Sequence, residues 1–194
     1  EAGTLVRHTP TGAALGHNKA DAVAARLQGV APMSRIASHA ARLPRDDELQ
    51  ALLEPFDVVI DATGEDEVLR RLGEAWWAVP RRFLSVSLGF AAHRLFLFGA
   101  QACSFPFEEF EGAMRPWLDE ERSQWTDAGE TLEGAGCWSP LFPARSDDVW
   151  LAAVTTVKHM ERAFGGEFPD GLRVLEQRAD GVVGFQPVEF EEGT

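Results

Sequence analysis

The stretch Phe56 to Ala62 constrains the fold of this chain more than any other. It is an apolar run bounded by Pro55 and Gly64, and a helical pattern follows at once from Glu65 to about Ala78. Apolar runs of this length between turn residues are typical of strands that are buried on both faces of a parallel sheet. A buried strand followed directly by a helix predicts a layered α/β fold.

The rest of the chain shows the same alternation of helical and strand patterns. Helices are expected over residues 16–27, 46–53, 107–117 and 146–164, and strands over residues 35–39, 83–88, 94–98, 172–176 and 182–188. Asp180-Gly181 is a strong hairpin signal between the last two strands. We therefore expect a single domain, residues 1–194, with a Rossmann-like mixed sheet flanked by helices and a C-terminal β-hairpin. Residues 100–145 lose periodicity and are rich in Pro, Gly, Trp and Phe, which indicates a long crossover segment.

The helix expected over residues 146–164 has the clearest pattern. Ser146 is placed to cap it, and Gly165-Gly166 to end it. The side chains expected to face inward are Val149, Trp150, Ala153, Val154, Val157, Met160 and Phe164.

Charge and composition exclude several classes of partner. The 194 residues contain 18 Lys and Arg against 31 Asp and Glu, a net charge of -13. Such a charge repels nucleic acid and anionic lipid. Two cysteines cannot form a disulfide framework or a paired-cysteine zinc site, which favours a reduced, cytoplasmic protein. The chain has no apolar run of about 20 residues, so we expect no membrane span.

Two basic residues near the start of the chain are candidate phosphate ligands. Arg7 lies in Leu5-x-Arg7-His8, and Lys19 lies in Gly16-x-x-Lys19-Ala20, in the first turn of an expected helix. Taken singly, each residue type is more often a solvated surface cation. Their spacing, together with the carboxylate of Asp61 at the end of the buried strand, favours a role in holding phosphates.

These motifs, in this order, resemble a ThiF/MoeB-type adenylating domain, the fold shared with ubiquitin-activating enzymes. The resemblance continues through residues 83–98 and the segment Gly136-Cys137-Trp138-x-Pro140-x-Phe142-Pro143-Ala144. It implies ATP-dependent activation of a carboxylate, often the C-terminal glycine of a ubiquitin-like or small sulfur-carrier protein, and a homodimer.

The resemblance also implies roles for individual residues. Arg7 and Lys19 would contact the triphosphate of ATP, and Asp61 would help to hold magnesium. Cys137 would accept the activated acyl group in those family members that use a thioester. Its aromatic and apolar neighbours fit a buried structural cysteine at least as well.

The chain departs from the family pattern in two places. Gly64 stands where the family carries a metal-binding carboxylate. The glycine-rich loop and first βαβ unit should precede Thr4, and Gly134-Ala135-Gly136 leads into no expected helix. We therefore expect that this chain does not cradle a nucleotide alone and that an upstream unit completes it.

Three alternatives remain open from the sequence. Asp61 could simply cap the helix that begins near Glu65. The chain could be a non-catalytic member of the family, a scaffold for binding or dimerisation. It could also be part of an NAD-dependent dehydrogenase, because a strand ending in Asp-Ala-Thr-Gly occurs in such folds.

Overall fold

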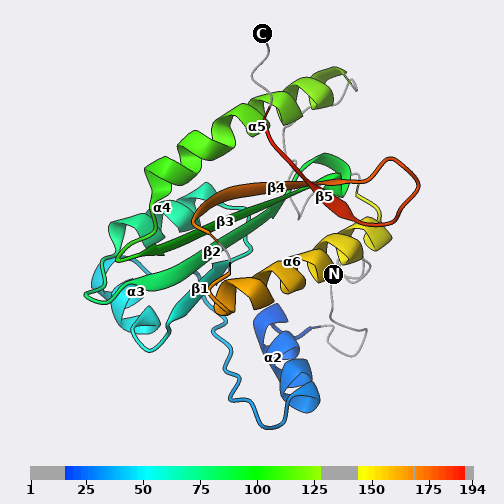
Figure 1. Ribbon diagram of the computed structural model, residues 1–194. Coiled ribbons are helices and arrows are strands. Elements are labelled where there is room, and N and C mark those ends of the chain that lie inside the picture. The colour runs from blue at the N-terminus through cyan, green and yellow to red at the C-terminus, as the bar shows by residue number, and fades with distance from the viewer. Residues whose placement is uncertain (1–15, 128–143, 168, 191–194) are drawn as a thin grey trace. The chain divides into compact units, whose positions relative to one another are not determined.

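The computed structural model describes residues 16–127, 144–167 and 169–190, which fall in two compact units (Figure 1). The first unit, residues 1–43, contains helix α2 (Lys19–Val30). The second unit, residues 44–194, contains the remaining elements. In chain order these are α3 (Asp46–Leu53), β1 (Val58–Asp61), α4 (Asp66–Glu74), β2 (Arg81–Leu88), the short 3-10 helix η2 (Phe90–Ala92), β3 (Arg94–Ala102), α5 (Phe107–Asp127), α6 (Ser146–Phe164), β4 (Gly171–Gln177) and β5 (Phe185–Val188).

The second unit is built on a five-stranded sheet in the order β1-β2-β3-β4-β5. Strands β1 and β2 are parallel, joined through α4, and the other neighbouring pairs are antiparallel. Strands β4 and β5 form the expected C-terminal hairpin. The prediction of a Rossmann-like mixed sheet flanked by helices is therefore confirmed.

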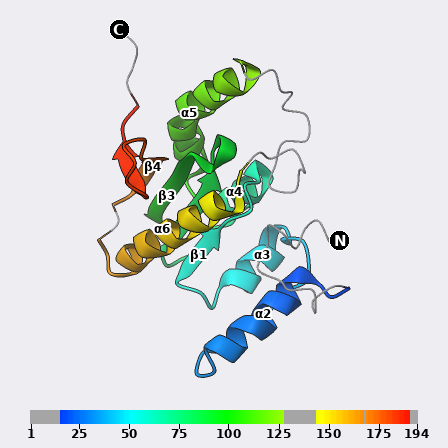
Figure 2. The same ribbon diagram turned by 90° about the vertical axis from the view of Figure 1, so that its right-hand side faces the viewer.

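Helices cover both faces of this sheet, with α5 on one side and α6 on the other (Figure 2). The alternation of side chains along β3 explains the arrangement. Phe96 and Phe98 face α5, where their rings lie 6.4 Å from Trp117 and 5.4 Å from Phe110. Residues on the opposite face form a second apolar cluster with α6, made of Leu84, Leu95, Leu97, Ala163 and Leu175.

An aromatic core fills the space beneath α4 and α5. Phe105 lies at its centre, with ring centroids 5.9 Å from Phe83, 5.7 Å from Phe98 and 5.6 Å from Phe110. The Phe105 backbone N–H also donates to the Leu72 carbonyl of α4. Edge-to-face aromatic contacts add to the free energy gained by burial.

A buried arginine at the start of β2 fixes α3 to the sheet. Arg81 is 5% exposed, and its guanidinium donates to the carbonyl oxygens of Leu53, Glu54 and Phe56 and to the Glu54 carboxylate. Its guanidinium carbon lies 5.2 Å from the centre of the Trp77 ring. These carbonyls follow the end of α3, where backbone acceptors lack partners within the helix. Arg81 thus does what a helix C-cap would do.

Two strand predictions are corrected. Residues 35–39 form no strand in the part of the chain that the structure describes. Strand β1 is not buried on both faces, since Ile60 is 45% exposed. The physical reason is that β1 is the edge of the described sheet, paired with β2 on one side.

Three helix predictions also change. Helix α5 continues to Asp127, well past Trp117, with Pro116 inside it. Helix α4 ends at Glu74, because Ala75 already has an extended backbone, and Trp76 is 58% exposed. Helix α6 has the expected bounds, but its N-cap is Arg145, not Ser146.

The inward face of α6 differs from the predicted one. Its buried residues are Ala152, Thr156 and Ala163, while Trp150, Val154, Val157 and Phe164 are each more than half exposed. The apolar spacing fits two faces of this helix, and the smaller side chains occupy the one against the sheet. None of the helices in the described residues is both long and apolar enough to cross a bilayer.

His159 lies on the packed side of α6. It lines a small cavity with Leu84 and Val86 of β2. Burial lowers the pKa of His159, and the nearby charges of Arg162 on α6 and Arg173 on β4 lower it further. The imidazole is therefore kept neutral in the folded protein over a wider pH range than in the unfolded chain.

We predict that Arg81→Met lowers the free energy of unfolding by about 2 to 4 kcal/mol, because three backbone carbonyls lose the hydrogen bond from Arg81, although that of Leu53 keeps one from the Phe56 N–H. Urea unfolding at pH 7 measures this loss. The matched control is Arg115→Met, since Arg115 is 68% exposed and pairs with Glu111 at 3.7 Å. Its effect should stay within about 0.5 kcal/mol, and equal effects of the two variants would contradict an anchoring role for Arg81.

We also predict that His159 makes stability depend on pH. Because its folded pKa is lowered from 6.5, the unfolded state binds the proton first as the pH falls below about 6.5, so stability is lost on acidification. Urea unfolding at pH 7.5 and 5.5 should show a smaller loss for His159→Gln than for the parent. An equal loss in both proteins would show that other groups carry the dependence.

Candidate functional site

The carboxyl ends of the two parallel strands define one edge of the sheet. Strand β1 ends at Asp61, opposite Ser85, and β2 runs on to Leu88. The loop Asp61–Gly64 and the turn Gly89–His93 therefore follow the parallel strands at the same edge. In open α/β sheets, ligands bind at this edge.

Asp61 organises the loop that follows β1. Its Oδ1 accepts hydrogen bonds from the Thr63 backbone N–H at 3.2 Å and the Thr63 hydroxyl at 2.6 Å. Its Oδ2 accepts from the Ser85 hydroxyl of β2 at 3.1 Å. Asp61 is 5% exposed, so these three donors take the place of water.

Asp61 does not cap α4. The N-cap of α4 is Glu65, and the Thr63 hydroxyl oxygen, which accepts from the Glu65 N–H at 3.2 Å, lies between Asp61 and the helix. Gly64 has φ +68°, a left-handed backbone that favours glycine. The conformation of the loop therefore depends on the hydrogen bonds of Asp61 and Thr63 and on the positive φ of Gly64.

The described residues offer no ready set of magnesium ligands. A carboxylate has about four lone-pair positions, and Asp61 already uses three of them for hydrogen bonds. The described part of the chain also contains no group of three or more His, Cys, Asp or Glu placed to hold a metal. This geometry does not fit a magnesium site without rearrangement.

The other predicted site residues cannot be placed relative to Asp61 in the described part of the chain. Lys19 lies in the first turn of α2, behind the N-cap Asn18, whose side chain accepts from the Ala20 N–H at 2.8 Å. Lys19 and Asp61 belong to different compact units, so their separation is undefined. Arg7 and Cys137 lie outside the described residues.

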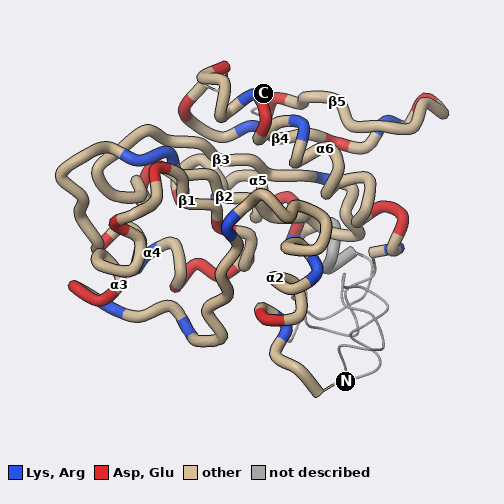
Figure 3. Tube along the Cα trace, turned by 90° about the horizontal axis from the view of Figure 1, so that it is seen from below, with Lys and Arg blue, Asp and Glu red and all other residues tan. Residues whose placement is uncertain are grey.

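Acidic residues begin α4 directly after the loop that follows β1, and Arg45, Arg70 and Arg71 pair with one of them, Glu67. Asp66 and Glu67 occupy the first turn of α4, directly after Glu65. Hydrogen bonds from Arg71 lower the pKa of Glu67, which keeps it ionised. Along the rest of the trace, basic and acidic positions are interspersed (Figure 3). Cations for a phosphate group would therefore have to come from outside this loop.

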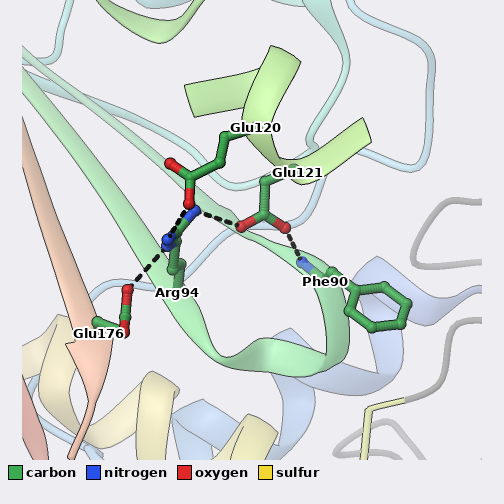
Figure 4. A network of polar contacts seen from close by, with 5 residues as sticks. All are labelled: Phe90, Arg94, Glu120, Glu121 and Glu176. Carbon is green, nitrogen blue, oxygen red and sulfur yellow. Dashed lines mark hydrogen bonds and ion pairs between the residues drawn. The ribbon is translucent and has the colours of Figure 1, made fainter. Parts of the chain in front are cut away.

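Sequence reasoning missed a second polar cluster at the same edge. Arg94, at the start of β3, pairs with Glu120 at 2.6 Å, Glu121 at 3.3 Å and Glu176 at 2.9 Å (Figure 4). Burial by itself would lower the pKa of Arg94, but hydrogen bonds to Glu120 and Glu176 raise it above the usual value. The guanidinium carbon also lies 5.2 Å from the Trp117 ring centre.

The cluster is continuous with the turn Gly89–His93. Glu121 accepts a hydrogen bond from the Phe90 backbone N–H, and a Cβ on Gly89 would lie 2.9 Å from the Glu121 carboxylate (Figure 4). Ala91 and Ala92 have φ of 53° and 57°, which costs roughly 1 to 2 kcal/mol for each alanine. The sequence contains no signal that Ala91 and Ala92 have a left-handed backbone. The adjacent residues Glu120 and Glu121 indicate only that this part of α5 is negatively charged.

We predict that Asp61→Asn lowers the free energy of unfolding by about 1 to 3 kcal/mol, because an amide nitrogen cannot accept the hydrogen bonds that a carboxylate oxygen accepts. Urea unfolding provides the measurement. Asp57→Asn, at an exposed residue just before β1, is the control and should change stability by less than about 0.5 kcal/mol. A neutral Asp61→Asn would show that the loop does not depend on the carboxylate.

Comparison with known proteins gives one informative relationship. No family model matches this chain. The chain is 33% identical over 196 residues to the ATP-dependent ubiquitin transferase-like protein Cap2 of Enterobacter hormaechei subsp. hoffmannii (strain UCI 50). The match covers 98% of this chain and 31% of the relative, so the chain spans less than two thirds of that protein's length. The chain is therefore similar to one segment of a protein that is named as ubiquitin transferase-like.

Proposed function

We propose that this chain is part of an ATP-dependent enzyme that activates a carboxylate, the C-terminus of a ubiquitin-like or small sulfur-carrier protein. The observation that carries the proposal is the similarity to the Cap2 relative over 98% of the chain, since that protein is named as ATP-dependent and ubiquitin transferase-like. The ThiF/MoeB resemblance of the motifs supplies the chemistry, which is formation of an acyl-adenylate and pyrophosphate.

The sheet supports this proposal through β1, which is the edge strand and is parallel to its neighbour β2. β1 pairs with β2 and is half-buried, with Ile60 at 45% exposure. An edge strand presents a row of backbone N–H and C=O groups to a further strand, so β1 is suited to pair with one. We propose that the nucleotide-loop unit expected before Thr4 supplies this neighbour in the complete protein.

The proposed roles of the basic residues follow from their chemistry. Adenylation builds negative charge on the phosphate oxygens as pyrophosphate departs. The planar fork of Arg7 and the point charge of Lys19 would bind those oxygens in complementary ways. Asp61 would hold the shape of the loop after β1, through Thr63 and Ser85, and would bind magnesium only if this loop rearranged.

We propose that Cys137 acts in a second step, after adenylation. If the acyl group moves from the adenylate to a thiol, the Cys137 sulfur would attack the acyl carbon and release AMP. Its proposed role rests on the resemblance of the Gly136 to Ala144 segment.

One observation favours a second candidate function. The three hydrogen bonds at Asp61 and the glycine at position 64 are compatible with a non-catalytic scaffold that keeps the fold and binds a partner or dimerises. A scaffold would retain the loop geometry and lack nucleotide chemistry.

The proposal is tested by exchange of labelled pyrophosphate into ATP, with the full-length protein and a peptide that ends in a glycine carboxylate. Lys19→Ala and Arg7→Ala should each remove roughly 2 to 4 kcal/mol of transition-state stabilisation, or about 30- to 800-fold in rate, with little change in Tm. Lys158→Ala is the matched control, since Lys158 is 69% exposed and pairs with Glu161. Absence of exchange in the parent protein would favour the scaffold.

A separate experiment tests Cys137. Cys137→Ala should preserve pyrophosphate exchange but abolish a thiol-sensitive covalent adduct with the substrate, since only the second step needs the sulfur. Cys103→Ala, at the half-buried free cysteine after β3, should change neither result. Iodoacetamide labelling of Cys137 only after unfolding would indicate a structural cysteine instead.

A further inference from the structure

The turn Gly89–His93 is more elaborate than a connection between β2 and β3 requires. Antiparallel strands are commonly joined by two residues in a favourable turn. Here the backbone passes through two consecutive left-handed alanines, Ala91 and Ala92. Residues in such strained conformations are found mainly at functional sites. They persist only where surrounding contacts hold the backbone in place.

Side chains from α5 and β4 hold this turn in place. Glu121 of α5 accepts from the Phe90 N–H, and Gln177 of β4 donates to the Ala92 carbonyl at 3.2 Å. The Gln177 amide also donates to Asp148 of α6 at 3.1 Å, and its backbone N–H donates to the His93 carbonyl at 2.8 Å. Three elements beyond the two strands therefore fix one short turn.

The rigid turn lies at the end of the sheet where a ligand is expected. It directly follows β2 at the carboxyl edge of the parallel pair, the edge where ligands bind in open α/β sheets. Functional groups on rigid, well-supported elements hold their geometry best.

We propose that the turn Gly89–His93 positions the carboxylate-bearing end of the substrate for adenylation, and that Glu121 is the positioning residue that keeps the turn left-handed. The inference rests on the proposed function. The glutamate acts through the turn: without it, the strain at Ala91 and Ala92 drives the backbone towards an ordinary conformation. Glycine at both positions removes that driving force, because glycine adopts positive φ readily.

The experiment is a rescue in the full-length protein. Glu121→Ala should reduce pyrophosphate exchange with the glycine-ended peptide at least tenfold and speed hydrogen exchange at the amides of residues 89–93. Adding Ala91→Gly and Ala92→Gly to this variant should restore pyrophosphate exchange to within about threefold of the parent. The two glycine substitutions alone should raise Tm by roughly 2 to 4 °C, because they relieve the strain at both positions.

The control is Glu120→Ala, which removes a neighbouring carboxylate of Arg94 and leaves in place the hydrogen bond from the Phe90 N–H to Glu121. Its exchange rate should stay within twofold of the parent. Equal losses for Glu120→Ala and Glu121→Ala, or failure of the glycines to restore the rate, would overturn the inference. If the parent shows no pyrophosphate exchange, the proposed function fails, and hydrogen exchange still decides whether Glu121 holds the turn.

Discussion

The burial of β3 on both faces is the constraint on which the larger unit depends. Residues Leu95 to Ala100 are all buried, with phenylalanines towards α5 and leucines towards α6. A strand that is apolar on both sides must have a layer on each face, which forces α5 and α6 to opposite sides of the sheet. It also needs a strand on each side to satisfy its backbone, and β2 and β4 supply those hydrogen bonds. The layers and the antiparallel half of the sheet therefore follow from one strand.

Two arginines at opposite ends of the β2–β3 pair illustrate two ways to bury a positive charge. Arg81 begins β2 and donates mainly to backbone carbonyls after α3, so it closes a helix end and ties it to the strand. Arg94 begins the antiparallel β3 and is surrounded by carboxylates from α5 and β4. Carbonyl acceptors make the first a structural anchor. Arg94 pairs with three carboxylates, so its cluster has an excess of negative charge. One of these carboxylates, Glu121, also accepts a hydrogen bond from the turn Gly89–His93.

Sequence patterns predicted the elements that depend on local signals. The mixed sheet, the bounds of α6, the helix at α2 and the C-terminal hairpin follow from apolar spacing, caps and Asp180-Gly181. The inward face of α6 could not be predicted, because Trp150, Val154 and Val157 fit a helical stripe as well as the smaller residues that pack on the sheet. The burial of β1 was overestimated, since an apolar run does not reveal whether a second neighbour is present. The carboxylate of Asp61 was singled out from sequence as a candidate site residue, but its hydrogen bond from Ser85 and the strained alanines depend on contacts between distant segments.

The acidic start of α4 bears on how an anionic ligand could be held. A helix N-terminus ordinarily attracts phosphate through its dipole and its backbone N–H groups. In α4 that position is followed at once by Asp66 and Glu67, and the adjoining loop is organised by a third carboxylate, Asp61. Glu67 is already paired with Arg70 and Arg71, so Asp61 and Asp66 are the carboxylates that oppose a phosphate at the end of β1. A nucleotide bound by the complete protein would then depend on cations carried elsewhere, and α2, with Lys19 in its first turn, is a helix start that offers one. The substitution of Lys19 is for this reason the most direct probe of the proposed chemistry.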